Sequence, residues 1–295
     1  MKMILDLSHY NTVVDWNAVK SAVDGVILRV AYRGYSNGKI VMDKKFKEYA
    51  KACKSLGIPF GIYFMSQAIN DPEADEEALY TVQNARVYGA TLPLFIDSEW
   101  SNKNHNGRAD GLSKSQRTQV TKTFCNKINE YGYTAGVYAS ESWFNTHLNY
   151  DKLINYYIWV ADYGKNTGYK VSSIALRKYD MHQYTSQAYV NGISGRVDMS
   201  EMYTVIGIDN NTPDQVVQTP VVTEENYNMK TIKSGSKGNA VKVWQIIIGV
   251  KSDGVFGSKT RNATLEFQKK AFPNNPKEWD GIVGKNSWKA GLESL

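Results

Sequence analysis

Short apolar segments alternate with amphipathic segments over the first 207 residues, and this alternation restricts the fold more than any other feature. Strands that are followed by helices through short connections form α/β proteins with mainly parallel sheets. The strand signals continue after about residue 148, whereas the helical signals fade there. The pattern therefore predicts an irregular, TIM-like β/α barrel with fewer helices than strands, in a domain spanning residues 1–207.

The periodicity of apolar residues locates the expected elements. Phe46, Tyr49 and Cys53 are spaced by three and four residues, which is typical of one face of an amphipathic helix, and Gly57 and Pro59 follow as a stop signal. The predicted helices are Asp15–Ala22, Asp43–Leu56, Glu73–Tyr88 and Lys114–Tyr131. The predicted strands are Ile4–Leu7, Gly25–Ala31, Phe60–Met65, Leu94–Ile96, Ala135–Ala139, Tyr157–Ala161 and Met181–Tyr184.

The composition changes after residue 207. Residues 208–229 lack helical periodicity and contain Pro213 and Pro220, so we expect a linker that is partly extended. Residues 230–295 contain a short repeat in which Asp253-Gly254 and Asp280-Gly281 each form a turn signal before a helix-like stretch. The sequence therefore predicts a small all-α C-terminal domain over residues 230–295.

The positive charge is concentrated in this C-terminal part. The whole chain has 35 Lys/Arg and 29 Asp/Glu, and residues 230–295 hold 12 of the former and 5 of the latter. A basic domain favours polyanions such as nucleic acid, an anionic membrane or a bacterial wall rich in phosphate polymers. The lysines are scattered with no nucleic-acid motif, which argues against nucleic acid as the partner. Of the other two polyanions, anionic wall polymers are expected as partners and a membrane is not.

The sequence also bears on location and cofactors. No stretch approaches the roughly 18 apolar residues of a membrane span, and the apolar run at Met1–Leu5 is too short for a signal peptide. We therefore expect synthesis in the cytoplasm, followed by release toward any outside target. Cys53 and Cys125 match no redox motif and are expected to be buried and reduced. The four histidines show no metal-ligand spacing, so neither a metal nor a cofactor is expected.

The segment Leu92–Trp100 is the strongest indication of chemistry. Its apolar run ends in Asp97 and Glu99, and side chains at i and i+2 of an extended strand lie on one face, roughly 6–7 Å apart along the chain. Two carboxyl groups that flank one bond suit the cleavage of a glycosidic linkage. Carboxylates at the C-terminal end of a buried parallel strand also lie where barrel enzymes carry their active sites.

Motifs spread over residues 1–207 resemble glycoside hydrolase family 25, the muramidases of many phage endolysins and bacterial wall hydrolases. One departure is His182, since members commonly carry Trp before the Gln-Tyr pair. Residues 230–295 resemble the helical peptidoglycan-binding domain that often accompanies wall hydrolases, through Ile232–Gly238, Trp244-Gln245 and the two Asp-Gly repeats. The motifs of the larger domain are Asp6-Leu7-Ser8, Gly61–Phe64, Asp97-Ser98-Glu99, Gly136–Tyr138, Ile158–Ala161, Gln183-Tyr184 and Gly192–Asp198.

The resemblance implies hydrolysis of the β-1,4 bond between N-acetylmuramic acid and N-acetylglucosamine in peptidoglycan, with retention of configuration. It assigns Glu99 as the general acid, whose pKa must be raised by desolvation and negative neighbours. Asp97 acts either as a nucleophile or by positioning the acetamido group of the substrate. Asp6 and Asp198 orient Asp97 or bind substrate. The implied substrate-binding residues are Tyr63, Tyr138, Trp159 and Gln183, and a core role is an alternative for the three aromatic residues.

Several functions remain open at this point. Host lysis by an endolysin is the first hypothesis, and a bacterial autolysin of the same activity is the second. A chitinase-like hydrolase also uses an acidic pair on a barrel strand, but Leu94, Phe95 and Ile96 occupy the positions of its longer acidic motif. The last hypothesis is a cell-wall-binding protein without catalytic activity. The presence of all four acidic residues, Asp6, Asp97, Glu99 and Asp198, argues against this hypothesis.

Overall fold

The computed structural model describes residues 1–207 and 230–294. The chain divides into two compact units, Met1–Thr219 and Pro220–Leu295. The predicted linker, residues 208–229, lies outside the described residues, so each unit is considered by itself.

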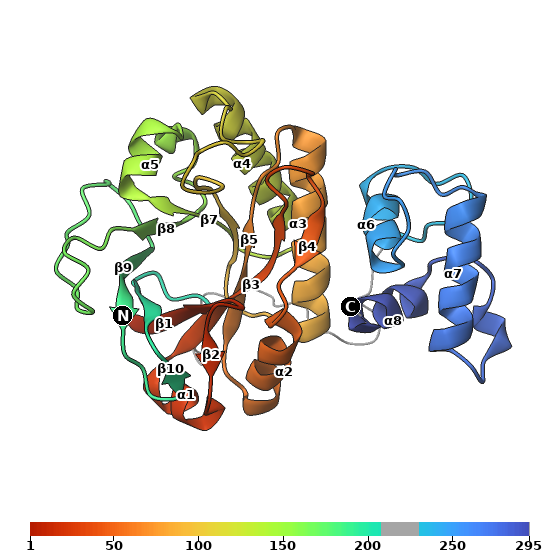
Figure 1. Ribbon diagram of the computed structural model, residues 1–295, viewed down its shortest axis with the longest axis horizontal. Helices are drawn as coiled ribbons and strands as arrows, with labels where there is room; N and C mark the ends of the chain where they lie inside the picture. Colours follow the sequence, from red (N-terminus) through yellow and green to blue (C-terminus); the bar gives the residue numbers. More distant parts are fainter. Residues whose placement is uncertain (208–229, 295) are drawn as a thin grey trace. The chain divides into compact units, whose positions relative to one another are not determined.

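The larger unit is a closed barrel of eight strands (Figure 1). Pairing of the first strand with β3 closes the sheet, and a short strand β4 (Ile40–Met42) extends it beyond β3. Two further strands, β2 (Thr12–Val13) and β10 (Ile193–Ser194), form a separate ribbon. The predicted fold class is confirmed. The barrel strands are β1 (Lys2–Leu7), β3 (Gly25–Arg33), β5 (Phe60–Met65), β6 (Leu94–Asp97), β7 (Ala135–Ser140), β8 (Tyr157–Ala161), β9 (Met181–Ala188) and β11 (Val197–Met202).

One strand of the barrel runs against the others. The strands β1, β3, β5, β6, β7, β8 and β9 are parallel to their neighbours in the series, whereas β11 pairs antiparallel with both β9 and β1. The start of β11 therefore lies at the C-terminal ends of the parallel strands. This reversal brings the beginning of one strand to the end of the barrel where the others finish.

The helices of the larger unit lie outside the barrel (Figure 1). Their ends follow local chemistry: the Asn70 side chain caps α3, Ser113 forms a capping box at α4, and Gly57 ends α2 in the left-handed conformation. Helix α5 was not among the predicted elements. The helices are α1 (Trp16–Ala22), α2 (Phe46–Leu56), α3 (Asp71–Tyr88), α4 (Lys114–Glu130) and α5 (Glu141–Thr146), with a 3-10 turn η1 at Tyr150–Lys152.

The barrel interior changes from apolar to polar along its axis. Because side chains alternate along a strand, residues two apart point to the same side. In β1 the fully buried Ile4 is followed by Asp6, and in β6 the fully buried Phe95 is followed by Asp97. Ile4, Phe95 and Trp159 belong to one hydrophobic cluster. Apolar side chains fill one end of the barrel interior. The other end, at the C-terminal ends of the parallel strands, is lined by polar side chains and can hold a functional site.

The described residues of the smaller unit form three α-helices and a 3-10 turn, η3 (Pro276–Glu278). The helices, which are labelled in Figure 1, are α6 (Asn239–Ile247), α7 (Ser258–Ala271) and α8 (Lys285–Ser294). Trp244, Phe256 and Trp288 are buried at its centre, and the rings of Trp244 and Trp288 meet edge-on with their centroids 5.2 Å apart. These large rings compensate for the small size of the unit, because each buries extensive apolar surface.

A buried glutamine ties each Asp-Gly turn to a helix. Gln245 Nε2 donates to Asp253 Oδ1 at 2.9 Å, and its Oε1 accepts from Gly254 N at 2.9 Å. Gln268 repeats this arrangement, donating to Asp280 Oδ1 at 3.0 Å and accepting from Gly281 N at 2.9 Å. The repeat seen in the sequence is therefore a structural repeat in which one amide side chain organises each turn.

Candidate active site

Asp6 and Asp198 face each other across the β1–β11 pair. The two residues are direct partners in the antiparallel register, although 191 residues separate them in the chain. Side chains of directly opposed residues lie on one face with their Cβ atoms about 4.5–5.5 Å apart. Burial and the adjacent charge of Asp198 raise the pKa of Asp6 well above its usual value, and burial raises the pKa of Asp198 to about 6.

Asp97 is the last residue of β6, and Glu99 follows it in the loop beyond the strand. Asp97 is 4% exposed, and its Oδ1 has no hydrogen-bond partner among the described residues. Burial, with the charge of Glu99 second, raises the pKa of Asp97 well above its usual value. An unsatisfied buried carboxylate oxygen is costly, so the packing of the barrel alone does not account for Asp97 at this position.

Glu99 has the surroundings of a carboxylic acid that stays protonated near neutral pH. Its side chain is exposed on the groove side, but protein packed around the carboxyl group and the charge of Asp198 raise its pKa to about 7. The electrostatic effects recorded among Asp6, Asp97, Glu99 and Asp198 show that the barrel brings these four predicted residues together.

Arg29 supplies positive charge to this acidic cluster and was not singled out in the sequence. It lies on β3, is 7% exposed, and its guanidinium contacts Asp43 Oδ2 at 2.8 Å through both Nε and Nη2. His9 Nδ1 lies 3.0 Å from the same oxygen. The charge of Arg29 opposes the rise in the pKa of Asp97 and Glu99. A charged residue inside an otherwise apolar strand was the available signal.

Gln183 links the acidic cluster to two tyrosines. Its Nε2 donates to Asp6 Oδ2 at 2.7 Å, and its Oε1 accepts from the hydroxyls of Tyr138 at 2.8 Å and Tyr163 at 2.6 Å. The two tyrosines thereby fix which end of the amide faces Asp6. Gln183 is 2% exposed, so this network holds the carboxyl group in place, and substrate binding by Gln183 stays a prediction. Tyr163 lies in a loop without periodic pattern and was missed.

The three aromatic residues that were predicted to bind sugars differ in their positions. Tyr63 and Tyr138 are half-buried and pack on the inner cluster just below the carboxyl groups. Trp159 is 1% exposed, and its Nε1 donates to Ser200 Oγ at 3.0 Å inside the barrel. Trp159 therefore has no free face on which a sugar can stack, and the structure gives it the core role that was its alternative.

His182 also has a structural position. It precedes Gln183 on β9, so its ring points to the opposite side of the strand from the acidic cluster. The ring is fully buried near Tyr179 and Tyr184, with Nε2 2.9 Å from the carbonyl oxygen of Asp162. Burial lowers the pKa of His182. It fills an aromatic position in the core and does not reach the carboxyl groups.

A groove of about 400 Å³ opens beside Glu99. Its walls come from the ends of β7 and β8, from the start of α5 and from the loop after β8. Such a volume suits a small ligand or one part of a chain that extends beyond it. The residues that line the groove are Glu99, Tyr138, Ser140, Glu141, Ser142, Ala161, Asp162 and Tyr163.

An aromatic group supports the segment between the two carboxylates. Trp143 Nε1 donates to Ser98 Oγ at 3.1 Å in a buried hydrogen bond. The Trp143 ring stacks on His147 with centroids 4.1 Å apart and meets Trp100 edge-on at 4.7 Å. Because Ser98 separates Asp97 from Glu99, this bond restricts the spacing of the two acidic groups.

The described residues offer neither a metal-binding cluster nor a membrane-spanning helix. Within residues 1–207 and 230–294, no three His, Cys, Asp or Glu side chains are arranged to hold a metal ion. Across the same ranges, none of the helices combines the length and apolar character that spanning a bilayer requires. Cys53 and Cys125 are both buried and free, as expected.

A closed β/α barrel with carboxyl groups gathered at the carboxyl ends of its strands is the arrangement of a glycoside hydrolase. The chain belongs to the glycosyl hydrolases family 25, whose family model matches residues 5–193. The match extends from β1 to β10 and includes Asp6, Asp97 and Glu99, while Asp198 lies five residues beyond its end.

Relatives agree with this membership. The autolytic lysozyme of Clostridium acetobutylicum is 26% identical over 267 residues, which are 86% of this chain and 75% of that protein. The modular autolysin LytC from Streptococcus pneumoniae, solved with a synthetic peptidoglycan ligand, is 30% identical with a TM-score of 0.56. That match covers 68% of this chain and 46% of LytC, so this chain corresponds to about half of the modular autolysin.

An enzyme of phage origin is similar to the same degree. The catalytic domain of endolysin ply40 from bacteriophage P40 of Listeria monocytogenes is 26% identical, with a TM-score of 0.57. The match covers 68% of this chain and 93% of that domain. The similarities therefore include autolysins and an endolysin.

Proposed function

We propose that this chain is a muramidase that hydrolyses the β-1,4 bond between N-acetylmuramic acid and N-acetylglucosamine in bacterial peptidoglycan. The observation that carries the proposal is the meeting of Asp6, Asp97, Glu99 and Asp198 beside one groove. The likeness to an autolytic lysozyme and to an autolysin solved with a peptidoglycan ligand supports this substrate.

Glu99 donates the proton to the leaving sugar oxygen in this proposal. It lines the groove and so reaches a bound glycan, and its pKa of about 7 keeps much of it protonated near neutral pH. Asp198 places negative charge beside it, which stabilises the positive charge that develops on the sugar ring.

Asp97 acts at the anomeric carbon by one of two routes, both of which retain configuration. As a nucleophile it bonds to the anomeric carbon while the leaving sugar oxygen departs with the proton of Glu99. As a positioning group it accepts a hydrogen bond from the acetamido N–H of the substrate, whose carbonyl oxygen then forms the bond to the anomeric carbon. Water hydrolyses the intermediate of either route. The unpartnered Oδ1 supports the second route, because it is a buried acceptor without a donor in the described residues. A glycan without N-acetyl groups separates the routes, since only the nucleophile route cleaves it.

The central test replaces the acid and reads the bond that is cut. Glu99→Gln should lower kcat by about two to four powers of ten on purified walls, the loss expected for removal of a general acid. Mass spectrometry of the wild-type products should show new reducing ends on N-acetylmuramic acid, and NMR of fresh product should show the β-anomer first.

The matched control is Glu141→Gln. Glu141 lines the same groove, but it accepts hydrogen bonds from the backbone N–H groups of Ala175 and Leu176, which an amide oxygen can also accept. The control should keep near-normal activity. Equal activity in Glu99→Gln and the control would place the acid on another residue.

The smaller unit is proposed as a wall-binding domain. Its excess of lysine suits anionic polymers of the wall, and its helical fold agrees with the peptidoglycan-binding domain that its sequence resembles. The expected place of action is the cell wall, reached after release from the cytoplasm.

Host lysis as a phage endolysin is the proposed biological role, supported by the likeness to the ply40 domain. The second candidate is a bacterial autolysin, favoured by the likeness to the autolytic lysozyme of Clostridium acetobutylicum. Production of the protein only after prophage induction supports the first role. Production throughout vegetative growth supports the second.

A further inference from the structure

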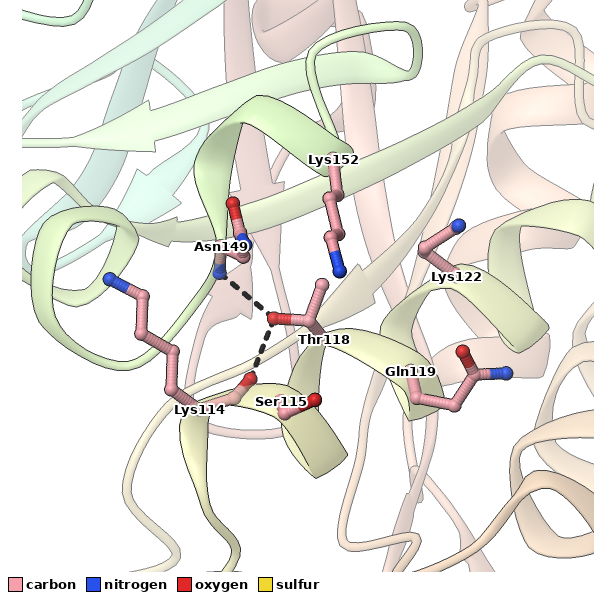
Figure 2. A pocket seen from close by; sticks show the side chains of 7 residues that line it. All are labelled: Lys114, Ser115, Thr118, Gln119, Lys122, Asn149 and Lys152. Atoms are coloured by element: carbon pink, nitrogen blue, oxygen red, sulfur yellow. Dashed lines mark hydrogen bonds between the residues drawn. The ribbon is translucent and has the colours of Figure 1, made fainter.

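A second cavity in the larger unit is lined by lysines and contains no carboxylate. It has a volume of about 300 Å³ and lies between the start of α4 and the turn η1 (Figure 2). Its charged lining residues are Lys114, Lys122 and Lys152, accompanied by polar neutral side chains. None of these residues belongs to the groove beside Glu99.

Two of the three ammonium groups have no internal partner. Lys114 Nζ donates to the carbonyl oxygen of Asn145 at 2.8 Å, and Figure 2 shows it directed away from the other two lysines. Lys122 and Lys152 form no ion pair or side-chain hydrogen bond in the described part of the chain. The cavity therefore holds two positive charges that are free to bind an anion.

The nearby acidic side chains are occupied elsewhere. Asp71 accepts hydrogen bonds from Thr123 Oγ1 at 2.8 Å and from Gln119 Nε2 at 3.2 Å. Asp151, next to Lys152 in the chain, pairs with Arg177 at 2.9 Å. Neither carboxylate lines the cavity, so neither neutralises its lysines.

The floor of the cavity is held in a fixed shape. Thr118 is buried, donates to the carbonyl oxygen of Lys114 at 2.7 Å and accepts from the backbone N–H of Asn149 at 2.8 Å, as Figure 2 shows. These bonds tie α4 to the segment before η1. The hydroxyl of Ser115 and the amide of Asn149 line the same space and add donors from other directions. The first turn of α4 further favours negative charge.

The chemistry fits a phosphate group. Lysine binds phosphate as a compact point charge with three donors, and no Asp or Glu lines this cavity to compete for its ammonium groups. The ammonium groups of Lys122 and Lys152 are the donors that remain free for the oxygens of a phosphate group. We propose that this cavity, which we call the lysine pocket (Lys114, Lys122, Lys152, Ser115, Thr118 and Asn149), binds a phosphate group.

The position of the pocket indicates the source of that phosphate. Helix α5 begins at the groove, since Glu141 and Ser142 line it, and Asn145 of the same helix contacts Lys114 at the pocket. Six helical residues span only about 9 Å. The groove and the pocket are therefore neighbouring sites of the larger unit, connected through α5 and Lys114. We assign the phosphodiester of a polymer attached to the wall glycan, an assignment of source that rests on the proposed function.

Binding is tested first without hydrolysis, on the full chain. NMR titration with inorganic phosphate should move the amide signals of residues 114–122 and 149–152 most. Read from these amide signals, the affinity for phosphate and for poly(glycerol phosphate) should fall at least tenfold in the variant Lys122→Gln/Lys152→Gln, and this readout leaves out polymer that is bound to the basic smaller unit. The matched control, Lys44→Gln/Lys51→Gln, removes two exposed lysines of the same unit and should bind as the wild type does. Equal binding by both variants would overturn the site.

The source of the phosphate is tested with three further probes. Poly(glycerol phosphate) should bind more tightly than inorganic phosphate and than a single-stranded oligonucleotide of equal charge. On walls that carry phosphate polymers, the pocket variant should cleave about threefold or more slowly than the control, and on walls stripped of them the two should be equal. Tighter binding of the oligonucleotide, or equal loss on both walls, would refute the wall polymer as source. If the chain had no muramidase activity, the NMR titration would still show whether the lysine pocket binds phosphate. Failure of the proposed function and failure of the proposed phosphate site can therefore be told apart.

Discussion

Asp97 shows the conflict between stability and chemistry at the scale of one residue. Its carboxyl group is buried, one oxygen has no partner in the described residues, and its pKa is raised well above the usual value by burial and by Glu99. A fold selected only for stability would not retain such a group. Its retention is explained by a task in which the free oxygen receives a donor from the substrate.

Replacing Asp97 by asparagine should therefore stabilise the protein while it abolishes activity. Asparagine keeps an oxygen at this position but removes the buried negative charge; a loss of about 1–3 kcal/mol of unfavourable desolvation is expected, and each kcal/mol shifts the melting temperature of a chain of this size by about 2–4 °C. The pKa of Asp97 is higher in the folded protein than in the unfolded chain, where it is near 4. The protonated Asp97 carboxyl therefore stabilises the folded protein fully below about pH 4, and this stabilisation is lost as the pH rises through the pKa of the folded state.

The gain in melting temperature from Asp97→Asn should thus be largest at pH 8 and vanish near pH 4, as measured by calorimetry. Asp151→Asn, a change at an exposed carboxylate, is the control and should show little effect. A gain of equal size at both pH values would contradict burial of the charge as its cause.

A second prediction concerns the pH range of activity. Burial and the charge of Asp198 raise the pKa of Glu99 to about 7, so activity that needs protonated Glu99 should fall as pH rises above about 7. Asp198→Asn removes one of these causes and makes ionisation of Glu99 easier. The alkaline limb of kcat/KM should therefore move to lower pH, and an unmoved limb would show that another group controls it.

At the scale of elements, the direction of β11 decides which residues share the site. Because β11 runs antiparallel to β1, its second residue, Asp198, lies opposite Asp6 near the end of β1. If β11 were parallel to β1, an acidic residue that faces Asp6 would have to lie near the C-terminal end of β11. The acidic residues therefore lie near the C-terminal ends of the parallel strands and near the N-terminal end of the antiparallel strand β11.

The strands were predicted correctly from the sequence where no functional polar residue interrupts their pattern of apolar residues. The strands Phe60–Met65 and Tyr157–Ala161 have the predicted bounds. The strand Val197–Met202 was recognised only as a motif, because Asp198 and Ser200 face inward and break the alternation of apolar and polar residues. Helix α5 has six residues, which is too few to show a period, and it carries Trp143, the support of Ser98.

The candidate site could be predicted only in part for a similar reason. The four carboxylates were found through their motifs, which sit at strand ends. Arg29 and Tyr163 were missed, because the role of each depends on neighbours from distant strands, Asp43 and Gln183 respectively. Trp159 carries the same aromatic signal as Tyr138, and only its position deeper in the barrel makes it a core residue.

The repeated glutamines of the smaller unit provide a prediction for an element. Gln268 is 1% exposed and bonds Asp280, Gly281, Ile282 and Ser287. Gln268→Met keeps the side-chain length but leaves the buried N–H of Gly281 and carbonyl of Ile282 without this partner. The cost should be about 2 kcal/mol or more in the free energy of unfolding of that unit.

Chemical denaturation of the full chain, followed by fluorescence, checks this change. Gln245→Met should have a similar effect, since Gln245 makes the corresponding bonds to Asp253 and Gly254. Lys269→Met, at an exposed position one residue from Gln268, is the control and should have little effect. Hydrolysis of soluble wall fragments by the larger unit should be unchanged in all three variants.

At the scale of the whole molecule, the charges divide between the two units. Residues 230–295 carry 12 Lys/Arg and 5 Asp/Glu, whereas the rest of the chain carries 23 and 24. Hydrolysis and attachment to a polyanionic wall are therefore expected to depend on different parts of the chain. Attachment through exposed charges is screened by salt, while a buried acidic cluster is screened much less.

A chain that ends at residue 207 should cleave soluble wall fragments at the normal rate and bind intact walls less. Sedimentation with purified walls measures the binding, and release of reducing sugar measures the cleavage. For the full chain, wall binding should fall as NaCl rises from 0.05 to about 0.5 M, where the Debye length shortens to a few ångströms. Unchanged binding by the shortened chain would show that the basic unit is not the anchor.

The antiparallel closure of the barrel also has a consequence during synthesis. Asp6 leaves the ribosome early, yet its strand partner is Asp198. The side-chain amide that bonds Asp6 belongs to Gln183, which is 177 positions after Asp6 in the chain. A nascent or truncated polypeptide without its last barrel strand has no complete catalytic centre. A partly made chain is therefore expected to lack hydrolytic activity, because the pair of Asp6 and Asp198 forms only when the two distant ends of the barrel sequence join.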